Sequence, residues 1–409
     1  MASKLTFGPS ISDWQERINV ERMNRERSEK ALETLRKHNI PTLLAARPEN
    51  TRYLTGLRGP EFVPQLWYVL FFAEHDPVVF HHAGWIHMYP SQAPWIKHWR
   101  LARSWLNRGC GSDATVEEAR LFADGIHREL EDRGLQNEPL GVMGFDGPAQ
   151  QALTVKGIKT VDGWPLMLEA TKTKTVDEIN CLKMAFSATD AAWNKAWELL
   201  KPGAIDVEVS RRSLMAAYDS GADEVPPGYF RSGPTSFDRA YENTQRMFNY
   251  GDLAYAAFCG VGYLGYKTCY YRTFSIGRQP ETHVKDWYRT LVERLDRVID
   301  AIKPGATTAD AARHFPPASQ WGYTEEAELL TLEIGHGIGL HHYGYPIINR
   351  QWSPDHPQVF EAGMTIAIEG REGEPNMGGV RLEDAVVVTE NGAELIDHWP
   401  RQEILVAPR

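Results

Sequence analysis

The chain has 409 residues, of which 42% are apolar, and its formal net charge is −10 at pH 7. This size and apolar content allow one large core or two ordinary domains, and they exclude a disordered or fibrous chain. The negative charge and the lack of a Lys/Arg-rich run argue against a nucleic-acid partner. Since no apolar run suits a membrane span or a secretory signal, we expect a cytoplasmic protein with no membrane partner.

The cysteines do not follow the spacing of a disulfide framework. Cys110, Cys181, Cys259 and Cys269 are few and irregularly spaced, and no CxxC pair suggests a zinc or redox site. We therefore expect reduced thiols.

The first part of the chain alternates between helical and strand-like patterns. A charged amphipathic pattern over residues 13–39 is followed by apolar strand patterns at 41–46 and 67–74, a helical pattern at 115–134 and the strand-like PLGVMGFD at 139–146. This alternation predicts an α/β domain over residues 1–170.

Two long helical patterns in the remainder of the chain end in nearly the same short sequence. Residues 200–204 read LKPGA, and residues 302–306 read IKPGA. A shared Pro-Gly stop can arise by chance, whereas a duplicated α+β half-domain would explain both copies. Such a duplication would place a cavity between the two halves.

A series of short motifs follows in a fixed order. GD at 251–252 precedes GY at 265–266 and RTF at 272–274, and then come GHGIGL at 335–340, EAGMTIAIE at 361–369 and GGVRLEDAVVVTENG at 378–392. The order resembles the pita-bread family of methionine and Xaa-Pro aminopeptidases, prolidase and creatinase, and the N-terminal region resembles the creatinase-type N-domain. The resemblance implies an α/β N-terminal domain followed by an α+β pita-bread domain over residues 171–409, with an internal pseudo-twofold duplication.

The family's metallopeptidases hold two metal ions with two aspartates, a histidine and two glutamates. By resemblance, His336, Glu369 and Glu383 occupy the last three positions, while the aspartate positions fall near Phe258 and on Cys269. Phe258 cannot coordinate a metal, and Cys269 would be a lone soft ligand among hard oxygens. We therefore expect neither a dinuclear site nor any cofactor. A single ion at the three remaining ligands is the alternative.

Creatinase is the family member that works without metal, and the chain resembles it in lacking both aspartates and in the run LHHYG at 340–344. It departs from creatinase at Ala240 and Tyr241, where the catalytic histidine belongs, and at Tyr271, which replaces a glutamate. We predict a metal-independent, creatinase-like hydrolase that cleaves a non-peptide C–N or related bond in a small, polar, cationic metabolite. One alternative is a single-metal hydrolase or lyase of the same fold, either peptidase-like or similar to the family's dimethylsulfoniopropionate lyase. The other is an inactive metabolite-binding protein.

Imidazole is the natural group for proton transfer near neutral pH. We expect His336 to be the general base, with Glu383 orienting it. One of His341 and His342 is expected to face the cavity as well.

Without a metal between them, the glutamates Glu369 and Glu383 need a positive partner. That partner is either the substrate or the neighbouring Arg371 and Arg381. A cationic substrate would be walled by aromatic rings, and the candidates are Tyr266, Tyr270 and Tyr271.

In creatinase-like dimers, the N-domain of one subunit closes the cavity of the other with an aromatic residue and an arginine. By resemblance, Phe62 matches the aromatic residue, and Arg58 is the nearest arginine. We therefore expect a homodimer, although an ordinary surface loop would explain the same residues.

Overall fold

The computed structural model describes residues 17–59, 63–239 and 241–407. The chain divides into two compact units, with Val20–Thr171 in one unit and Lys172 onward, together with residues before Val20, in the other. Each unit has its own hydrophobic core. No described helix combines the length and the apolar character needed to cross a membrane.

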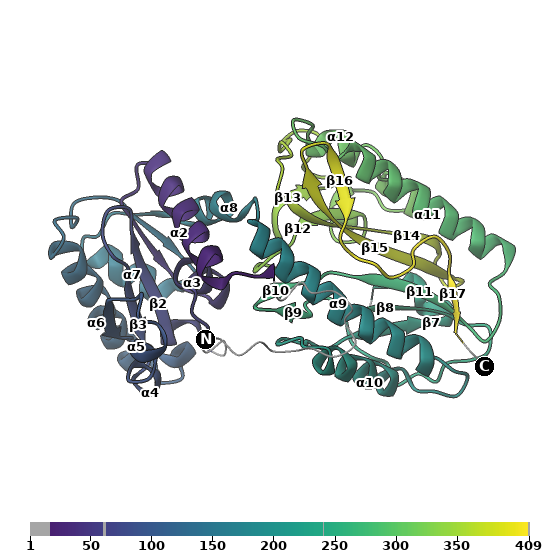
Figure 1. Ribbon diagram of the computed structural model, residues 1–409, viewed down its shortest axis with the longest axis horizontal. Helices are drawn as coiled ribbons and strands as arrows, with labels where there is room; N and C mark the ends of the chain where they lie inside the picture. The colour runs from purple at the N-terminus through teal and green to yellow at the C-terminus, as the bar shows by residue number, and fades with distance from the viewer. Residues whose placement is uncertain (1–16, 60–62, 240, 408–409) are drawn as a thin grey trace. The chain divides into compact units, whose positions relative to one another are not determined.

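The N-terminal unit is built on a six-stranded mixed sheet with the strand order β4-β3-β2-β1-β5-β6 (Figure 1). Its strands are β1 (Thr42–Ala45), β2 (Trp67–Phe72), β3 (Val78–His81), β4 (His98–Leu101), β5 (Leu140–Met143) and β6 (Thr160–Asp162). Its helices are α2 (Val20–Lys37), α3 (Pro48–Thr55), α4 (Ala83–Ile86), α5 (Tyr89–Gln92), α6 (Ser112–Glu131), α7 (Gly147–Val155) and α8 (Trp164–Thr171), with 3-10 turns at Pro64–Leu66 and Leu106–Arg108.

The central strands of this sheet are buried on both faces, which explains their unbroken apolar runs. Helix α6 buries Phe122, Ile126 and Leu130 in the core beside the sheet. The N-terminal unit is therefore the expected α/β domain.

The C-terminal unit contains a four-stranded sheet, a five-stranded sheet and a short hairpin (Figure 1). The four-stranded sheet has the order β17-β11-β8-β7, from β7 (Tyr229–Ser232), β8 (Leu253–Ala257), β11 (Tyr271–Ile276) and β17 (Leu405–Ala407). The five-stranded sheet has the order β13-β12-β14-β15-β16, from β12 (Ile334–Gly337), β13 (Gly344–Ile348), β14 (Thr365–Glu374), β15 (Gly378–Thr389) and β16 (Gly392–Leu395). Strands β9 (Gly262–Tyr263) and β10 (Tyr266–Lys267) form the hairpin.

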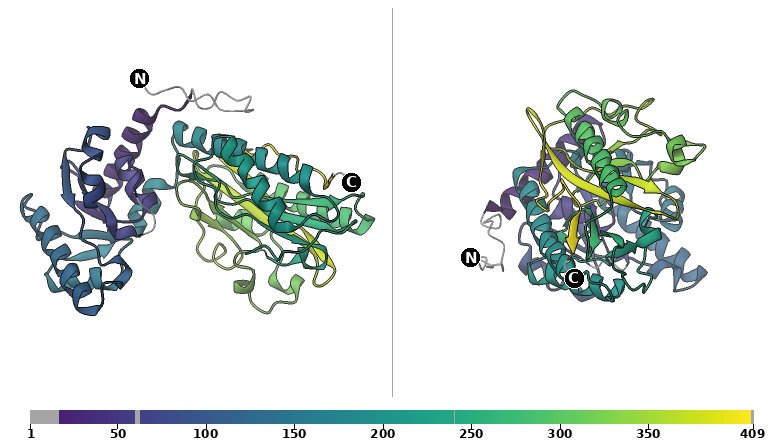
Figure 2. Two further views of the ribbon diagram at one scale, coloured as in Figure 1. Left: turned by 90° about the horizontal axis from the view of Figure 1, so that it is seen from below. Right: turned by 90° about the vertical axis from the view of Figure 1, so that its right-hand side faces the viewer.

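The C-terminal unit has three long helices, α9 (Val176–Leu199), α10 (Asp206–Asp219) and α11 (Thr282–Ala301), and the short α12 (Thr308–Ala312). It also has 3-10 turns at Gly233–Phe237, Ala318–Trp321 and Glu326–Leu329. Helix α11 lies along β14 and β15 (Figure 1 and Figure 2) and buries Leu291, Leu295 and Val298 in the core that it shares with them. Helix α9 begins in a capping box, because Thr175 and Glu178 bond each other's backbone N–H groups.

The two halves of the C-terminal unit repeat the same hydrogen bonds. After α9, the N–H of Gly203 donates to the carbonyl of Phe248 at 2.8 Å; after α11, the N–H of Gly305 donates to the carbonyl of Phe360 at 3.0 Å. Both glycines have positive φ, 90° and 86°, a conformation that favours glycine, and this explains why both helices are followed by the same Pro-Gly motif. These paired contacts are those of the expected internal duplication.

Strands β11 and β15 hold the two sheets together through a side chain. The hydroxyl of Thr273 donates to the carbonyl of Arg381 at 2.7 Å and accepts from its N–H at 2.9 Å. Thr273 and Arg381 lie near the motif residues of their strands. These two hydrogen bonds therefore hold the site residues of one sheet in position relative to those of the other.

Candidate active site

Three motif residues share one face of the five-stranded sheet. His336 on β12 lies opposite Ala367 of β14, and Glu369, two residues further along β14, lies opposite Glu383 of β15. Because side chains alternate along a strand, this register places His336, Glu369 and Glu383 on the same face. Nε2 of His336 is 3.7 Å from a carboxylate oxygen of Glu383.

These three side chains are wholly buried. Burial raises the pKa of Glu369 to about 7, with the neighbouring Glu383 adding to the effect, and burial likewise raises the pKa of Glu383 to about 7. Burial lowers the pKa of His336, against the opposing influence of Glu369. Among the described residues, both carboxylate oxygens of Glu369, Oε1 of Glu383 and Nε2 of His336 have no hydrogen-bond partner. Such unpaired buried atoms are costly, and in this cluster they fit a bound group that would satisfy them.

Two thiols face this cluster from the other sheet. Ala257 of β8 pairs with Tyr271 of β11, and hydrogen bonds beyond the strand ends keep the two segments together, so Cys259 lies opposite Cys269. Alternation places both thiols on the face of Tyr271, while Phe258 points the other way and packs on Trp193 with ring centroids 4.3 Å apart. The residue that faces the site is therefore Cys259 rather than Phe258, and Cys269 is not a lone sulfur.

Of the two tandem histidines, the structure brings His342 to the cluster. Its Nε2 lies 3.3 Å from Sγ of Cys269, and its ring stacks at 6.2 Å from that of His336. Burial lowers the pKa of His342 to about 4, with His336 adding to the effect. His341 has no place in either group of possible metal ligands.

The glutamates have a positive partner that the sequence did not suggest. Arg239 lowers the pKa of Glu369 more than Arg381 does, and it also lowers that of Glu383. Arg381 is buried over the ring of Tyr255 at 5.2 Å, and its three guanidinium nitrogens have no hydrogen-bond partner among the described residues.

Arg371 is occupied elsewhere. Its guanidinium lies over Phe237 at 4.2 Å and Trp321 at 5.1 Å, and it donates to the hydroxyl of Tyr323 at 3.1 Å. The structure thus keeps Arg371 in an aromatic cage, and Arg239 and Arg381 supply the positive charge near the glutamates.

Only one of the expected tyrosines reaches the cluster. Tyr271 is buried on the site face, and burial followed by the charge of Glu369 raises its pKa. The hydroxyl of Tyr266 instead donates to Glu178 at 2.9 Å, and that of Tyr270 donates to Asp190 at 3.1 Å. Tyr266 and Tyr270 therefore contact α9 instead of the cluster. Tyr270 does so because it precedes Tyr271, and successive side chains along a strand point to opposite faces.

The remaining expectations concern four residues: Arg58, Phe62, Ala240 and Tyr241. Arg58 belongs to the N-terminal unit and is exposed, and Phe62 lies outside the described residues. Ala240 also lies outside them, whereas Tyr241 is 72% exposed. Arg239, just before these positions, is the residue that reaches the glutamates.

The cluster fits a single metal ion. Ligand atoms of Cys269, His336 and Glu383 all lie within 4.8 Å of one another, and their donor types suit a borderline ion such as zinc. At the two positions where the resemblance implied aspartates, the described residues offer no carboxylate, since Phe258 faces away and Cys269 is a thiol. The dinuclear ligand set that the resemblance implied is therefore incomplete.

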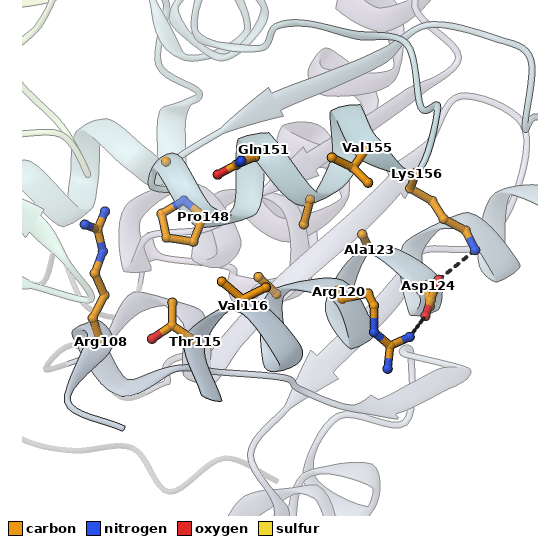
Figure 3. Close-up of a pocket in the computed structure, with 13 residues that line it drawn as sticks. Arg108, Thr115, Val116, Arg120, Ala123, Asp124, Pro148, Gln151, Val155 and Lys156 are labelled. Atoms are coloured by element: carbon orange, nitrogen blue, oxygen red, sulfur yellow. Dashed lines mark hydrogen bonds and ion pairs between the residues drawn. The ribbon is translucent and has the colours of Figure 1, made fainter. Parts of the chain in front are cut away.

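A separate groove of about 690 Å³ lies in the N-terminal unit between α6 and α7 (Figure 3). Val116 and Val155 on its walls are 70% and 82% exposed, and Arg120 and Lys156 both bond Asp124. No expected site residue is among the described residues that line it, so the groove is distinct from the cluster.

Sequence reasoning missed Cys259 and Arg239 as site residues. A signal existed for the first: Cys259 and Cys269 flank the glycine-rich GVGYLGYK of residues 260–267, which turns the chain back and sets the cysteines opposite each other. For Arg239 the sequence holds no such signal, because the residue reaches the glutamates from an irregular segment.

Comparison with known proteins finds a matching protein family and several similar proteins. Residues 180–390, just over half of the chain, match the model of metallopeptidase family M24. The probable dipeptidase PepE of Mycobacterium tuberculosis is 30% identical over 261 residues, which are 63% of this chain and 66% of that protein. The Xaa-Pro dipeptidase of Pyrococcus furiosus is 29% identical over 254 residues, 61% of this chain and 69% of that one. The matches thus span about two thirds of these relatives.

Solved structures show the same fold over nearly the whole chain. An Xaa-Pro dipeptidase from Bacillus anthracis superposes with a TM-score of 0.76 at 22% identity, covering 94% of this chain and 99% of that one. Dipeptidase PepE from Mycobacterium ulcerans gives a TM-score of 0.76 at 23% identity, with 96% and 100% covered.

These findings correct the expected function. A metal-independent, creatinase-like hydrolase of a non-peptide C–N bond is contradicted, because the matching family is one of metallopeptidases and the similar proteins are named dipeptidases. The expectation treated the loss of two aspartates as the loss of the metal site, and it overlooked the thiol and imidazole donors that gather around Cys269. With its motifs in order and its fold shared, this chain belongs to metallopeptidase family M24.

Proposed function

We propose that this chain is a metal-dependent hydrolase that cleaves the C–N bond of a small peptide, of about dipeptide size. The observation that carries the proposal is the convergence of Cys269, His336 and Glu383 beside the unpaired carboxylate of Glu369. The names of the similar dipeptidases supply the substrate class.

In this proposal Cys269, His336 and Glu383 hold one divalent ion. Such an ion, when bound, polarises the scissile carbonyl and makes an attacking water more acidic. Binding requires the deprotonated thiol and carboxylate, and burial raises the pKa of both groups, so metal binding should release protons.

Glu369 is the proposed general base. Its pKa of about 7 suits a group that must both accept and return a proton near neutral pH. Glu369 takes a proton from the water as the C–O bond forms, and it gives that proton to the amine nitrogen as the C–N bond breaks. One water is consumed, and the products are a carboxylic acid and an amine.

Arg239 is proposed to stabilise the negative charge that develops on the carbonyl oxygen. Its guanidinium lies close enough to lower the pKa of both Glu369 and Glu383. A fixed positive charge in a dry site stabilises such an oxyanion far more than it would in water.

The test is metal removal and restoration in the full chain. The protein is dialysed against EDTA until elemental analysis finds no metal, and zinc, manganese or cobalt is then added. Release of free amino acids is followed with a panel of Xaa-Pro dipeptides and matched Xaa-Ala dipeptides. We expect turnover to vanish on chelation and to return with at least one ion. Undiminished dipeptide hydrolysis by the metal-free chain would overturn the proposal, as would the absence of turnover with every ion and peptide.

We also propose that the chain acts as a homodimer, with the loop around Phe62 of one subunit closing the site of the other. The likeness of the N-terminal region to the creatinase-type N-domain supports this arrangement. Light scattering of active protein at assay concentration tests it, and a fully active monomer would contradict it.

A further inference from the structure

Two sulfur atoms and an imidazole meet at the half-buried side of the cluster. The ligand atoms of Cys259, Cys269 and His342 all lie within 4.8 Å of one another, and Sγ of Cys269 is 3.3 Å from Nε2 of His342. Cys259 and His342 are only partly buried, whereas His336 and Glu383 are fully buried. This triad shares Cys269 alone with the triad of the proposed function.

The backbone holds the three donors in place before any ligand arrives. The N–H of Gly260 donates to the carbonyl of Thr268 at 2.6 Å, which keeps Cys259 opposite Cys269. Gly260 has a φ of 85°, and a Cβ there would lie 2.8 Å from Pro226, so only glycine fits the close approach. The N–H of Lys267 donates to the carbonyl of Gly339 at 2.9 Å and ties the hairpin to the loop that carries His342.

Burial raises the pKa of both thiols, so a bound ion would have to displace their protons. One backbone contact opposes this effect at Cys259. The N–H of Tyr270 donates to Sγ of Cys259 at 3.4 Å, a contact that favours negative charge on the sulfur. The separation of 3.3 Å between a sulfur and a nitrogen is near the value of about 3.6 Å that tetrahedral zinc imposes on such a ligand pair. Sulfur and imidazole donors select zinc and similar soft or borderline ions over manganese or magnesium.

We propose that Cys259, Cys269 and His342 bind a thiophilic metal ion of the zinc class through two thiolates and one imidazole. The inference rests on the proposed function in one respect, since Cys269 serves both triads. It deepens that function, because it makes the chain selective for a soft ion where the family's carboxylate ligands accept hard ones.

The test uses cobalt as a spectroscopic probe and zinc for affinity, both with the full chain. Cobalt bound by thiolates shows an intense near-ultraviolet charge-transfer band whose strength follows the number of sulfur ligands. We expect that band in the wild type, about half of it in Cys259→Ser, and none in Cys259→Ser/Cys269→Ser. X-ray absorption at the zinc edge should find more sulfur neighbours per zinc ion in the wild type than in Cys259→Ser.

Zinc affinity provides the second measurement. Competition with a chromophoric chelator should show Cys259→Ser and His342→Ala weakened by more than the roughly 10- to 100-fold that loss of an outer partner costs. The matched control is Cys110→Ser, an exposed cysteine of the N-terminal unit, which should bind zinc like the wild type. Circular dichroism of each metal-free variant checks folding, and Cys259→Ala and His342→Asn replace any variant that does not fold.

The outcomes separate this inference from the proposed function. If Cys259→Ser and His342→Ala keep the wild-type spectrum and affinity while His336→Ala loses metal and turnover, the inference is wrong and the function stands. If Cys259→Ser lowers the sulfur count per zinc ion but the wild type hydrolyses no peptide with any ion, the function is wrong and the inference stands. A wild type that binds neither cobalt nor zinc overturns both.

Discussion

Glu369 and Glu383 are directly opposite each other on neighbouring strands, yet the proposed function gives them different roles. Glu383 lies with Cys269 and His336 in a possible metal triad, whereas Glu369 does not. We expect Glu369→Gln to lower kcat/KM by about 100- to 10,000-fold while the metal content stays at the wild-type level. Glu383→Gln should lower both.

Kinetics and elemental analysis of the same preparations check this division of roles. The exposed Glu390→Gln, just beyond the end of β15, is the matched control and should change neither quantity. Full metal content in Glu383→Gln together with metal loss in Glu369→Gln would reverse the assignment.

Glu333 offers a pH-dependent test of a buried carboxyl outside the metal ligands. Burial raises its pKa from 4.5 to about 7, against the opposing charge of Arg294. Between these values the folded chain keeps a proton that the unfolded chain has released, so the free energy of unfolding falls as the pH rises through this window and levels off above it. We expect Glu333→Gln to show a shallower fall.

Urea unfolding of the metal-free protein at a series of pH values, with and without the substitution, provides the measurement. Equal slopes in the wild type and Glu333→Gln would show that Glu333 ionises normally in the folded state.

At the scale of residues, the motifs located the histidine and both glutamates, because each motif residue lies in a regular strand whose alternation fixes its direction. Cys259 was missed because the aspartate position seemed to fall on its neighbour Phe258. A shift of one residue in a strand moves a side chain to the opposite face, and the sequence alone does not show which register the strand adopts.

At the scale of elements, the contact between β11 and β15 depends on one hydroxyl. Thr273 is buried and both donates to and accepts from the backbone of Arg381. Thr273→Val keeps the shape but leaves a buried carbonyl and N–H without that partner, so we expect a loss of about 1–3 kcal/mol in the free energy of unfolding. The exposed Thr154→Val is the control for the same chemical change. Equal urea midpoints for Thr273→Val and the wild type would contradict this role.

Several elements were predictable from local pattern. The helical pattern at 115–134 corresponds to α6 (Ser112–Glu131), and the apolar run at 67–74 contains β2 (Trp67–Phe72). The repeated Pro-Gly motif also indicated the duplicated halves. The pairing of β11 with β15 through Thr273 could not be predicted, because it depends on contacts between residues more than a hundred positions apart.

At the scale of the whole molecule, each unit has a core of its own, and the candidate metal ligands belong to the C-terminal unit. We expect calorimetry to resolve two unfolding transitions, of which zinc raises only one. At a free zinc concentration of 100 times the dissociation constant, the gain should be about 2.7 kcal/mol. Cys269→Ser should abolish the shift, and an equal rise of both transitions would contradict the assignment.

The division into an α/β unit and a duplicated unit could be expected from the sequence. Near residue 171 the short alternating helix and strand patterns give way to long helical patterns, and this change can be seen locally. The chemistry of the site could not, because it depends on donors from both sheets of the C-terminal unit.

The packing of Phe258 has a consequence for anyone who would engineer a carboxylate metal ligand at this position. Its ring fills a space between Trp193 and Gly228, where a Cβ on the glycine would lie 2.6 Å from the phenylalanine. Phe258→Asp would therefore sacrifice about 3–5 kcal/mol of packing and place a charge against an indole. A carboxylate that faces the cluster cannot be installed here by a single substitution. A designer would have to move the strand by one residue, and in doing so would turn Cys259 away from the cluster that it now faces.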